Sequence, residues 1–265
     1  MKGAKKFNKK GQVTIFVILA LVIIVLGTLI YFFYPGIKIT TSPLEETPQA
    51  YFQNCIEGNL RENAELIGFQ GGSIEPDSSF NYGGTPVAYL CYTTQPYGDS
   101  PTLKCVPQQA LLVNHIEEEM KEVMKNKVHS CFDEMKVDYT KKYTGVNLEE
   151  KDFNIKLAHN KIILHSDSIL TLTKDSPERY ENFDVVLNNN LFELASLART
   201  IVAWEAAYGS ADPVYFMNYY PNLDIKNPSP DGGKTRIWII KDMVTGDTFQ
   251  FASSEIIWPL GIPSP

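Results

Sequence analysis

An uncharged run at residues 13–34 constrains this chain more than any other part of its sequence. Sixteen of its 22 residues are Val, Ile, Leu or Phe, and the run lacks the polar face that a helix at the edge of a soluble core shows. As a helix it would extend about 33 Å, enough to cross a hydrocarbon core of about 30 Å. Residues 13–34 are therefore predicted to form one transmembrane helix.

The charges on the two sides of this run predict its orientation. Five lysines and no acidic residue precede it, whereas Lys38 is the nearest charge that follows. Because positive charge favours the cytoplasmic side, we expect a single-pass protein of the cell membrane with a cytoplasmic N-terminus. The run is longer than the apolar part of a cleavable signal, so we expect it to remain as an anchor. The predicted parts are a basic cytoplasmic segment (1–12), the transmembrane helix (13–34), a linker (35–47) and an extracytoplasmic domain (48–265).

The residues just before the apolar run have a recognisable pattern. Lys9-Lys10-Gly11-Gln12 resembles the processing site of archaeal class III signal peptides and of type IV pilin-like proteins. The resemblance implies cleavage between Gly11 and Gln12, with the hydrophobic helix kept on the mature chain. Phe16 stands five residues after that site, where these pilins commonly carry Glu. Plain charge flanking of an apolar helix is the alternative interpretation.

The composition of the outer part describes a folded, acidic domain. Residues 36–265 contain 19 basic and 31 acidic residues, a net charge of −12. Such a body repels phosphate backbones, so nucleic acid is not expected as a partner. The hydrophobic share of the whole chain, 44%, is ordinary for globular proteins and predicts a packed core.

Apolar residues at three- and four-residue spacing predict three helices in the outer domain. They cover residues 48–67, 108–135 and 190–208. Pro48 suits the first turn of the first helix, and Gly71 follows its end. Asn190 is expected to cap the third helix with Glu193 at the capping-box position, and Gly209 to end it.

Alternation of apolar and polar residues predicts an antiparallel sheet. The expected strands are 153–157, one long or bulged strand at 162–173, and 180–187, followed by a closing hairpin of 236–241 with 248–253. Residues 73–106 are expected as a long loop or a loose hairpin, with a strand at 87–92. The predicted fold class is α+β, with two long helices packed together and a third helix against the antiparallel sheet. Residues 48–140 are expected as a helical part and residues 150–265 as a sheet part.

Several of these pieces resemble a group of uncharacterised archaeal proteins with an N-terminal membrane anchor. The similar residues are Cys55, Gly68-Phe69-Gln70-Gly71-Gly72, Cys131, Lys241-Asp242, Gly246 and Phe249-Gln250-Phe251-Ala252. The resemblance implies a membrane-anchored protein and assigns it no activity.

Four cysteines, Cys55, Cys91, Cys105 and Cys131, lie in the predicted outer domain. None of their spacings is Cys-x-x-Cys, so a structural zinc site is not indicated, and an extracytoplasmic location favours disulfides. Cys55 and Cys131 lie on the apolar stripes of two helices, while Cys91 and Cys105 flank a Gly- and Pro-containing loop. We expect the pairs Cys55–Cys131 and Cys91–Cys105, with four free buried thiols as the alternative.

No motif in the chain predicts a particular chemistry. The sequence has no Gly-x-Ser-x-Gly elbow, no phosphate-binding glycine loop and no His-Glu-x-x-His. The four histidines are expected to be structural: His115, His129, His159 and His165. Three aspartates of one predicted loop miss the calcium-loop spacing: Asp212, Asp224 and Asp231. No catalytic, cofactor-binding or metal-ligating residue is therefore predicted.

Three functions are compatible with these observations. The first is a structural or interaction role at the cell surface or envelope, with the lipid bilayer and another envelope or surface protein as partners. The second is a type IV pilin-like filament subunit. The third is an extracytoplasmic hydrolase, which requires that folding bring together two carboxylates in a cleft or a Ser/His pair.

Overall fold

The computed structural model describes residues 19, 21–22, 47–93, 102–254 and 256–257 of a chain that divides into two units after Glu46. Every element discussed below belongs to the second unit, Thr47–Pro265. Among the described residues, no helix combines the length and the apolar character that crossing a membrane requires. The predicted transmembrane helix at 13–34 lies outside the described residues except for positions 19, 21 and 22. The processing site at Gly11 and Gln12 and residues 35–46 of the linker also lie outside them.

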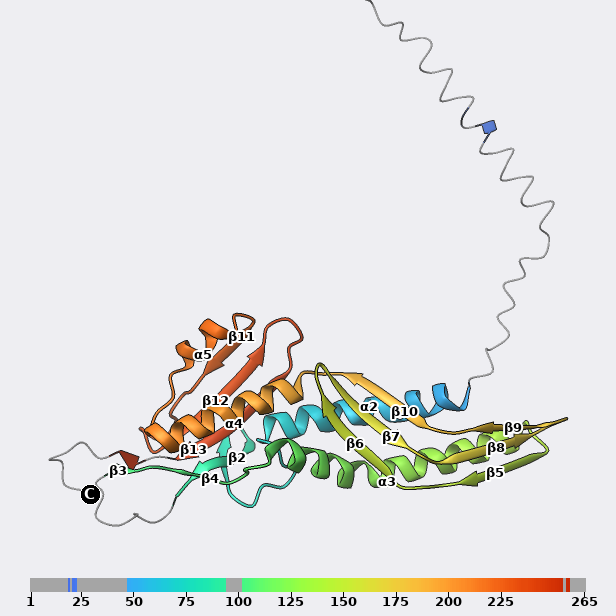
Figure 1. Cartoon of the computed structure of the whole chain (residues 1–265), viewed down its shortest axis with the longest axis horizontal. Helices are drawn as coiled ribbons and strands as arrows, with labels where there is room; N and C mark the ends of the chain where they lie inside the picture. Colours follow the sequence, from blue (N-terminus) through green and yellow to red (C-terminus); the bar gives the residue numbers. More distant parts are fainter. Residues whose placement is uncertain (1–18, 20, 23–46, 94–101, 255, 258–265) are drawn as a thin grey trace, which may run out of the picture. The chain divides into compact units, whose positions relative to one another are not determined.

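Figure 1 shows the helices of the second unit. They are α2 (Pro48–Phe69), α3 (Leu112–Thr140), α4 (Leu191–Tyr208) and α5 (Pro213–Tyr219). Thr47 caps α2, because its hydroxyl accepts a hydrogen bond from the Ala50 N–H at 3.3 Å. Gly209 ends α4 with a φ of 80°, a left-handed conformation that favours glycine. The three predicted helices are confirmed, although α3 begins at Leu112 instead of residue 108.

α2 and α3 run side by side and bury their apolar stripes against each other (Figure 1). Phe52 of α2 and Phe132 of α3 stack with ring centroids 4.7 Å apart. The rings of Phe183 and Phe132 are perpendicular, with their centroids 5.3 Å apart, an arrangement that aromatic pairs favour. Cys55 and Cys131 join the same two helices by a disulfide, with Cα atoms 6.1 Å apart. The predicted pair of packed long helices is therefore present.

Strands of the described residues form four sheets. The strands are β1 (Ser79–Tyr82), β2 (Thr85–Tyr92), β3 (Thr102–Leu103), β4 (Val106–Pro107), β5 (Gly145–Glu149), β6 (Phe153–Ala158), β7 (Lys161–Ser166), β8 (Ile169–Thr173), β9 (Pro177–Tyr180), β10 (Phe183–Asn188), β11 (Leu223–Lys226), β12 (Thr235–Asp242), β13 (Thr248–Ser254) and β14 (Ile256–Ile257). The largest sheet has the order β1-β2-β13-β12-β11, with β4 also paired to β2. The others are β10-β7-β6, β5-β8-β9 and β14-β3.

The prediction of one strand at 162–173 is wrong, because the chain divides there into β7 and β8, which belong to different sheets. The Ser168 N–H donates to the Ser166 hydroxyl at 3.3 Å, and the two hydroxyl oxygens lie 2.8 Å apart. Such local side-chain bonds compete with a continuous strand ladder. The strand predicted at 180–187 is divided as well, at Asn182, whose φ is 58°.

The predicted hairpin at 236–241 and 248–253 is confirmed as β12 and β13. The predicted antiparallel pairing is present in β6-β7-β10 and in this hairpin, whereas the parallel pairing of β13 with β2 was not predicted. A parallel pair needs a long crossover connection, which strand alternation does not reveal. Through this pair, residues 48–140 and 150–265 contribute to one sheet and one compact unit. Gly68 of α2 packs closely on β13, because a Cβ at that position would lie 2.5 Å from the Thr248 carbonyl oxygen.

Candidate functional site

A cavity of about 500 Å³ lies beside α4. The β6–β7 turn, the connection between α5 and β11, and the end of β12 complete its wall. The lining residues are His159, Asn160, Asn190, Phe192, Glu193, Leu194, Ser196, Leu197, Thr200, Tyr219, Tyr220, Pro221, Asn222, Leu223 and Asp242. Cavities of this size that combine apolar walls with a few hydrogen-bonding groups are the usual sites for small ligands. This α4 cavity is therefore the candidate binding site.

Among the described residues, only one of the two carboxylate oxygens of Glu193, a lining residue, has a partner. Its Oε1 accepts a hydrogen bond from the Asn160 N–H at 2.8 Å and lies 2.5 Å from His159 Nδ1. Its Oε2 is buried and has no hydrogen-bond partner within the described part of the chain. Because this oxygen has almost no exposed surface, it lies within the cavity wall, closed to a ligand, and its missing partner is a cost to the fold.

Asp242 supplies the second carboxylate of the cavity, and both of its oxygens accept hydrogen bonds from within the protein. Its Oδ1 accepts the backbone N–H groups of Val244 at 2.7 Å and Thr245 at 3.2 Å, which closes the β12–β13 turn. Its Oδ2 accepts a hydrogen bond from Asn190 Nδ2 at 2.7 Å. Both lining carboxylates therefore bind groups of the fold.

The predicted capping box at the start of α4 is wrong. The Asn190 side chain makes no capping bond and binds Asp242 instead. The neighbouring Asn189 accepts the Leu191 N–H at 2.8 Å, and Glu193 reaches across to the β6–β7 turn. Both residues predicted for capping therefore lie in the wall of the α4 cavity.

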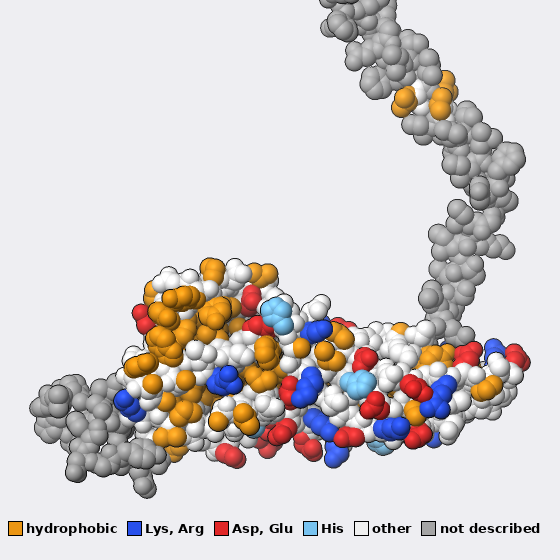
Figure 2. Space-filling model, viewed as in Figure 1, with side chains coloured by type: hydrophobic (Ala, Val, Ile, Leu, Met, Phe, Trp, Pro, Cys, Tyr) orange, Lys and Arg blue, Asp and Glu red, His pale blue; other side chains and the backbone are white. Residues whose placement is uncertain are grey.

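Two tyrosines at the C-terminal end of α5 form the aromatic side of the cavity. Tyr219 and Tyr220 line it and remain 67% and 50% exposed, so their rings are available to a ligand. The rings of Tyr219 and Tyr215 lie 5.0 Å apart, and Trp204 of α4 lies 4.7 Å from Tyr215. Hydrophobic side chains gather over this part of the surface in Figure 2. These rings extend the apolar surface beyond the cavity.

Sequence reasoning placed α5 in an irregular stretch and missed these tyrosines. A signal for the helix is present at its start, where Asp212 precedes Pro213. The Asp212 carboxylate accepts the Val214 N–H at 2.9 Å, as an N-cap does, and Pro213 occupies the first turn. The helix is only seven residues long, too short to show an apolar period.

A second pocket, of about 370 Å³, contains a serine and a histidine in contact. Ser73 Oγ lies 2.7 Å from His115 Nε2, although the two residues are 42 positions apart in the chain. Glu119, one turn along α3, accepts the Ile74 N–H at 2.8 Å. The two bonds hold the loop after α2 against α3, and the Ser/His contact is also one that nucleophilic catalysis uses.

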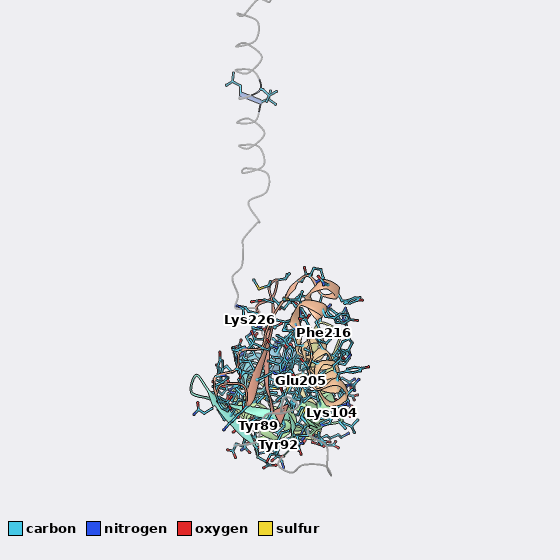
Figure 3. All side chains as sticks on the ribbon, turned by 90° about the vertical axis from the view of Figure 1, so that its left-hand side faces the viewer. Tyr89, Tyr92, Lys104, Glu205, Phe216 and Lys226 are labelled. Atoms are coloured by element: carbon cyan, nitrogen blue, oxygen red, sulfur yellow. A yellow bond between two sulfur atoms is a disulfide. The ribbon has the colours of Figure 1, made fainter. Side chains whose placement is uncertain are left out.

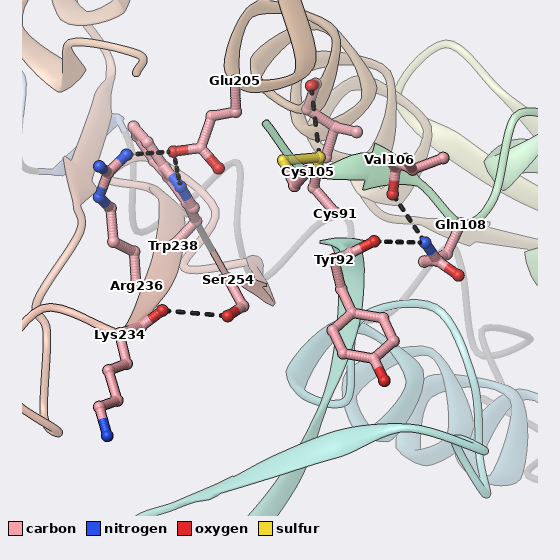
Figure 4. The surroundings of a disulfide bond; sticks show 11 residues. Cys91, Tyr92, Cys105, Val106, Gln108, Glu205, Lys234, Arg236, Trp238 and Ser254 are labelled. Carbon is pink, nitrogen blue, oxygen red and sulfur yellow. Dashed lines mark hydrogen bonds and ion pairs between the residues drawn. A yellow bond between two sulfur atoms is a disulfide. The ribbon is translucent and has the colours of Figure 1, made fainter. Parts of the chain in front are cut away.

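Glu205 of α4 is fully buried, and no sequence pattern indicated it. It lies inside the unit, below Phe216 of α5 in the view of Figure 3. Its Oε1 accepts hydrogen bonds from Arg236 at 2.9 Å and from the Trp238 indole at 3.1 Å (Figure 4). The resulting charge pair joins α4 to β12, and its cost in desolvation is offset only while both partners remain.

The four cysteines form the two predicted pairs. Cys55 is bonded to Cys131, and Cys91 to Cys105, whose Cα atoms lie 5.2 Å apart. The second bond joins the end of β2 to the segment before β4 (Figure 4). The alternative of four free thiols is therefore wrong.

Besides His159, two histidines join different elements through carboxylates. His129 Nδ1 lies 2.9 Å from Glu150, and the hydrogen bond between them raises the pKa of His129 above its ordinary value. His165 Nδ1 lies 2.6 Å from Asp184, and that bond likewise raises the pKa of His165, with a smaller contribution from Asp167. Both sites hold strands and helices together and lie outside the α4 cavity.

The three aspartates of the predicted loop act separately. Asp212 caps α5, and Asp224 pairs with Lys226 at 2.7 Å. Asp231 accepts the backbone N–H of Thr235 at 2.8 Å and closes a turn. Within the described ranges, no group of three or more His, Cys, Asp or Glu side chains has a geometry suited to a metal ion.

Comparisons with known proteins do not assign this chain to a family. No protein-family model, no curated protein and no solved structure matches this chain.

Proposed function

We propose that this chain is a single-pass membrane protein whose extracytoplasmic unit binds a small polar ligand at the cell surface. The observation that carries the proposal is the α4 cavity of about 500 Å³, whose wall combines the exposed rings of Tyr219 and Tyr220 with the polar side chain of Asn222. Fixed hydrogen-bonding groups in a partly apolar cavity are what orient a small ligand. The candidate partners are therefore the lipid bilayer, through residues 13–34, and a component of the envelope or surface.

Two observations support the extracytoplasmic location. The uncharged run at 13–34 follows five lysines, an arrangement that favours a cytoplasmic N-terminus. All four cysteines are paired in disulfides, which persist in oxidising compartments.

A topology experiment tests the location. A reporter fused after Pro265 should be active only outside the cytoplasm, and protease added to intact spheroplasts should digest residues 47–265. Intact-mass measurement of the membrane-extracted protein should still include residues 13–34. Protection from protease, or a mature chain that begins after residue 34, would contradict the proposed anchor.

A thermal-shift screen tests the binding role. The full-length protein in lipid nanodiscs is screened against amino acids, nucleosides, short peptides and saccharides. At least one class should raise the melting temperature of the wild type and not that of Tyr219→Ala, which removes an exposed ring of the cavity wall. Val137→Ala is the control, because this exposed residue of α3 is not among the cavity lining residues. Absence of any shift, or an unchanged shift with Tyr219→Ala, would contradict the role.

A hydrolase is the second candidate, and the contact between Ser73 and His115 is the observation that favours it. His115 Nε2 would take the Ser73 proton as Oγ forms a bond to an ester carbonyl carbon. The alcohol would leave with that proton, and water would then release the acid. A fluorophosphonate probe should label the wild type and not Ser73→Ala. Ser78→Ala, in the same pocket, is the control, and labelling that survives Ser73→Ala would exclude this candidate.

A further inference from the structure

We infer that an aromatic patch on and beside α5 docks on the lipid bilayer that holds the proposed anchor. The α5 patch is defined by five exposed side chains: Tyr208, Val214, Tyr215, Tyr219 and Tyr220. The inference rests on the proposed anchor at residues 13–34 and adds a second contact between the protein and the membrane. It follows from the composition of α5, the continuity of the patch, its lack of charge and the length of the tether.

The helix α5 is apolar on its exposed face as well as on its buried face. Phe216 is buried, whereas Val214 and Tyr219 are 57% and 67% exposed. Apart from the tyrosine hydroxyls, Asn218 is the only polar side chain of this helix. A surface helix ordinarily carries polar residues on its outer face, and an exposed apolar patch marks a site of protein or membrane contact. The outer face of α5 is therefore expected to have a partner.

The aromatic side chains of the patch form one continuous surface. The Tyr215 ring lies 5.0 Å from the Tyr219 ring and 4.7 Å from the Trp204 ring. The Trp204 ring in turn lies 5.7 Å from Tyr208, at the end of α4. Figure 2 shows hydrophobic side chains gathered over this part of the unit. Tyrosine and tryptophan are the residues that concentrate at the headgroup level of membranes, because their rings are apolar and their hydroxyl or N–H groups are polar.

The turn between β12 and β13 extends the patch with aliphatic side chains. The Met243 N–H donates a hydrogen bond to the Asn222 carbonyl at 2.9 Å, which holds the turn beside the segment that follows α5. Met243 is 63% exposed, and Val244, at 76%, is the most exposed large hydrophobic side chain of the described residues. Aliphatic side chains beside aromatic rings are what interfacial membrane contacts bury at the boundary of headgroups and acyl chains.

The patch carries no net charge in a strongly acidic domain. Residues 213–223 contain no charged side chain. Asp212 before them caps α5, and Asp224 after them pairs with Lys226 at 2.7 Å. Lys104 donates a hydrogen bond to a carbonyl in the last turn of α4, so a positive charge also borders the patch. Because acidic surfaces are repelled by lipid phosphates, this uncharged part of the unit is the one suited to approach them.

The tether is the reason to choose the bilayer over a second copy of the chain or another protein. Residues 35–46 separate the proposed anchor from Thr47, and a chain of that length extends at most about 43 Å. The unit would therefore remain close to the bilayer, at a high effective concentration of lipid surface. A contact too weak for a free domain is favoured under that condition, whereas a protein partner has to be met by diffusion.

Photo-crosslinking of the full-length chain in phosphatidylcholine vesicles tests the contact. The amino acid p-benzoylphenylalanine replaces Val214 or Tyr215 in the patch, or Val137 of α3 as the control. Val137 is 59% exposed, and its neighbour Asp138 accepts a hydrogen bond at 3.2 Å from Tyr51, near the start of α2. The control therefore lies close to the tether, and proximity to the tether alone would label position 137 most. Docking predicts a lipid adduct that is several-fold stronger at positions 214 and 215.

A charge placed in the patch supplies the second measurement. With the probe at Tyr215, Val214→Asp should reduce the lipid adduct to the level at position 137, because a carboxylate is costly to desolvate. Val214 is exposed and lies in the first turn of α5, where an acidic residue is compatible with the helix. Val137→Asp is the matched control and should leave the adduct at Tyr215 unchanged.

The remaining outcomes separate this inference from the proposed anchor. Adducts to a second copy of the chain, or equal lipid yields at positions 137, 214 and 215, would overturn the inference. If the protein stays with carbonate-washed vesicles while its patch forms no lipid adduct, the docking fails and the anchor stands. If the protein leaves the washed vesicles, the anchor and the inference that rests on it both fail.

Discussion

Glu193, in the first turn of α4, accepts a hydrogen bond from the backbone N–H of Asn160 at 2.8 Å. Asn160 has a φ of 57°, so the β6–β7 turn places this N–H outside its own strand ladder. The bond fixes the turn against the helix and leaves the second carboxylate oxygen of Glu193 in the cavity wall. One side chain thus holds the fold and shapes the candidate site.

The disulfide between α2 and α3 should be the stronger of the two covalent links. It spans 76 residues, for which the chain-entropy relation gives a stabilisation of about 4.5 kcal/mol. The Cys91–Cys105 bond spans 14 residues, and the same relation gives about 3 kcal/mol. Urea unfolding should therefore show the larger loss when Cys55 and Cys131 are both replaced by Ala.

Reduction supplies the control for this ranking. Reductant should destabilise the wild type by more than it destabilises the Cys55→Ala, Cys131→Ala variant, which retains only the shorter link. Peptide mapping under non-reducing conditions should join Cys55 to Cys131. A map that joins Cys55 to Cys91 or Cys105 would contradict the disulfide between α2 and α3.

Two glycines of α2 should respond to alanine in opposite directions. A Cβ at Gly58 meets nothing within 4 Å, so Gly58→Ala should stabilise the protein by about 0.5–1 kcal/mol through helix propensity. A Cβ at Gly68 would lie 2.5 Å from the Thr248 carbonyl oxygen, and α2 would have to move off β13. Gly68→Ala should cost about 2 kcal/mol or more. Urea unfolding measures both, and equal effects at the two positions would contradict the close contact.

Removal of the buried Glu205 carboxylate should destabilise the unit strongly. Glu205→Ala leaves Arg236 and the Trp238 indole without their acceptor, at a cost of about 3 kcal/mol. Glu205→Gln should cost less, because its amide oxygen still accepts from Trp238. Glu62→Ala, at an exposed position of α2, is the matched control and should change the free energy of unfolding little. A Glu205→Ala variant as stable as this control would refute the prediction.

Stability should fall as the pH rises above 6.5, the ordinary pKa of histidine. The pKa values of His129 and His165 are raised in the folded state, chiefly by hydrogen bonds to Glu150 and Asp184. A group with a raised folded pKa stabilises fully below its unfolded pKa, and this contribution disappears as the pH passes the folded pKa. Melting temperatures across this range should therefore decline.

His165→Asn identifies the source of that decline. The variant lacks the titrating ring, so its melting temperature should change less across the same range. Glu62→Gln should keep the wild-type slope, since this exposed glutamate is remote in sequence from both histidines. A wild-type slope that is flat, or that His165→Asn leaves intact, would show that the carboxylate bonds do not stabilise the charged histidine.

Local patterns in the sequence were sufficient to predict several helices and strands. The stripes through Phe52 and Phe132 predicted α2 and α3, because a helical period of 3.6 places such residues on one face. Apolar and polar residues alternate on both sides of a Thr-Gly turn, and this pattern predicted the β12–β13 hairpin because a strand has a period of two. The stripe positions of Cys55 and Cys131 predicted their pairing, because two helices that bury those faces bring the cysteines together.

Tertiary structure alone decided the rest, because the deciding contacts join residues far apart in the chain. The parallel pairing of β2 with β13 depends on a long crossover, and Ser73 meets His115 only when the loop after α2 folds onto α3. Glu193 had a local role available in its own helix, but the Asn160 N–H, 33 residues earlier, is its partner. Propensity and periodicity describe a residue's own segment, whereas the partner of a carboxylate is chosen by whichever unsatisfied donor the fold brings beside it.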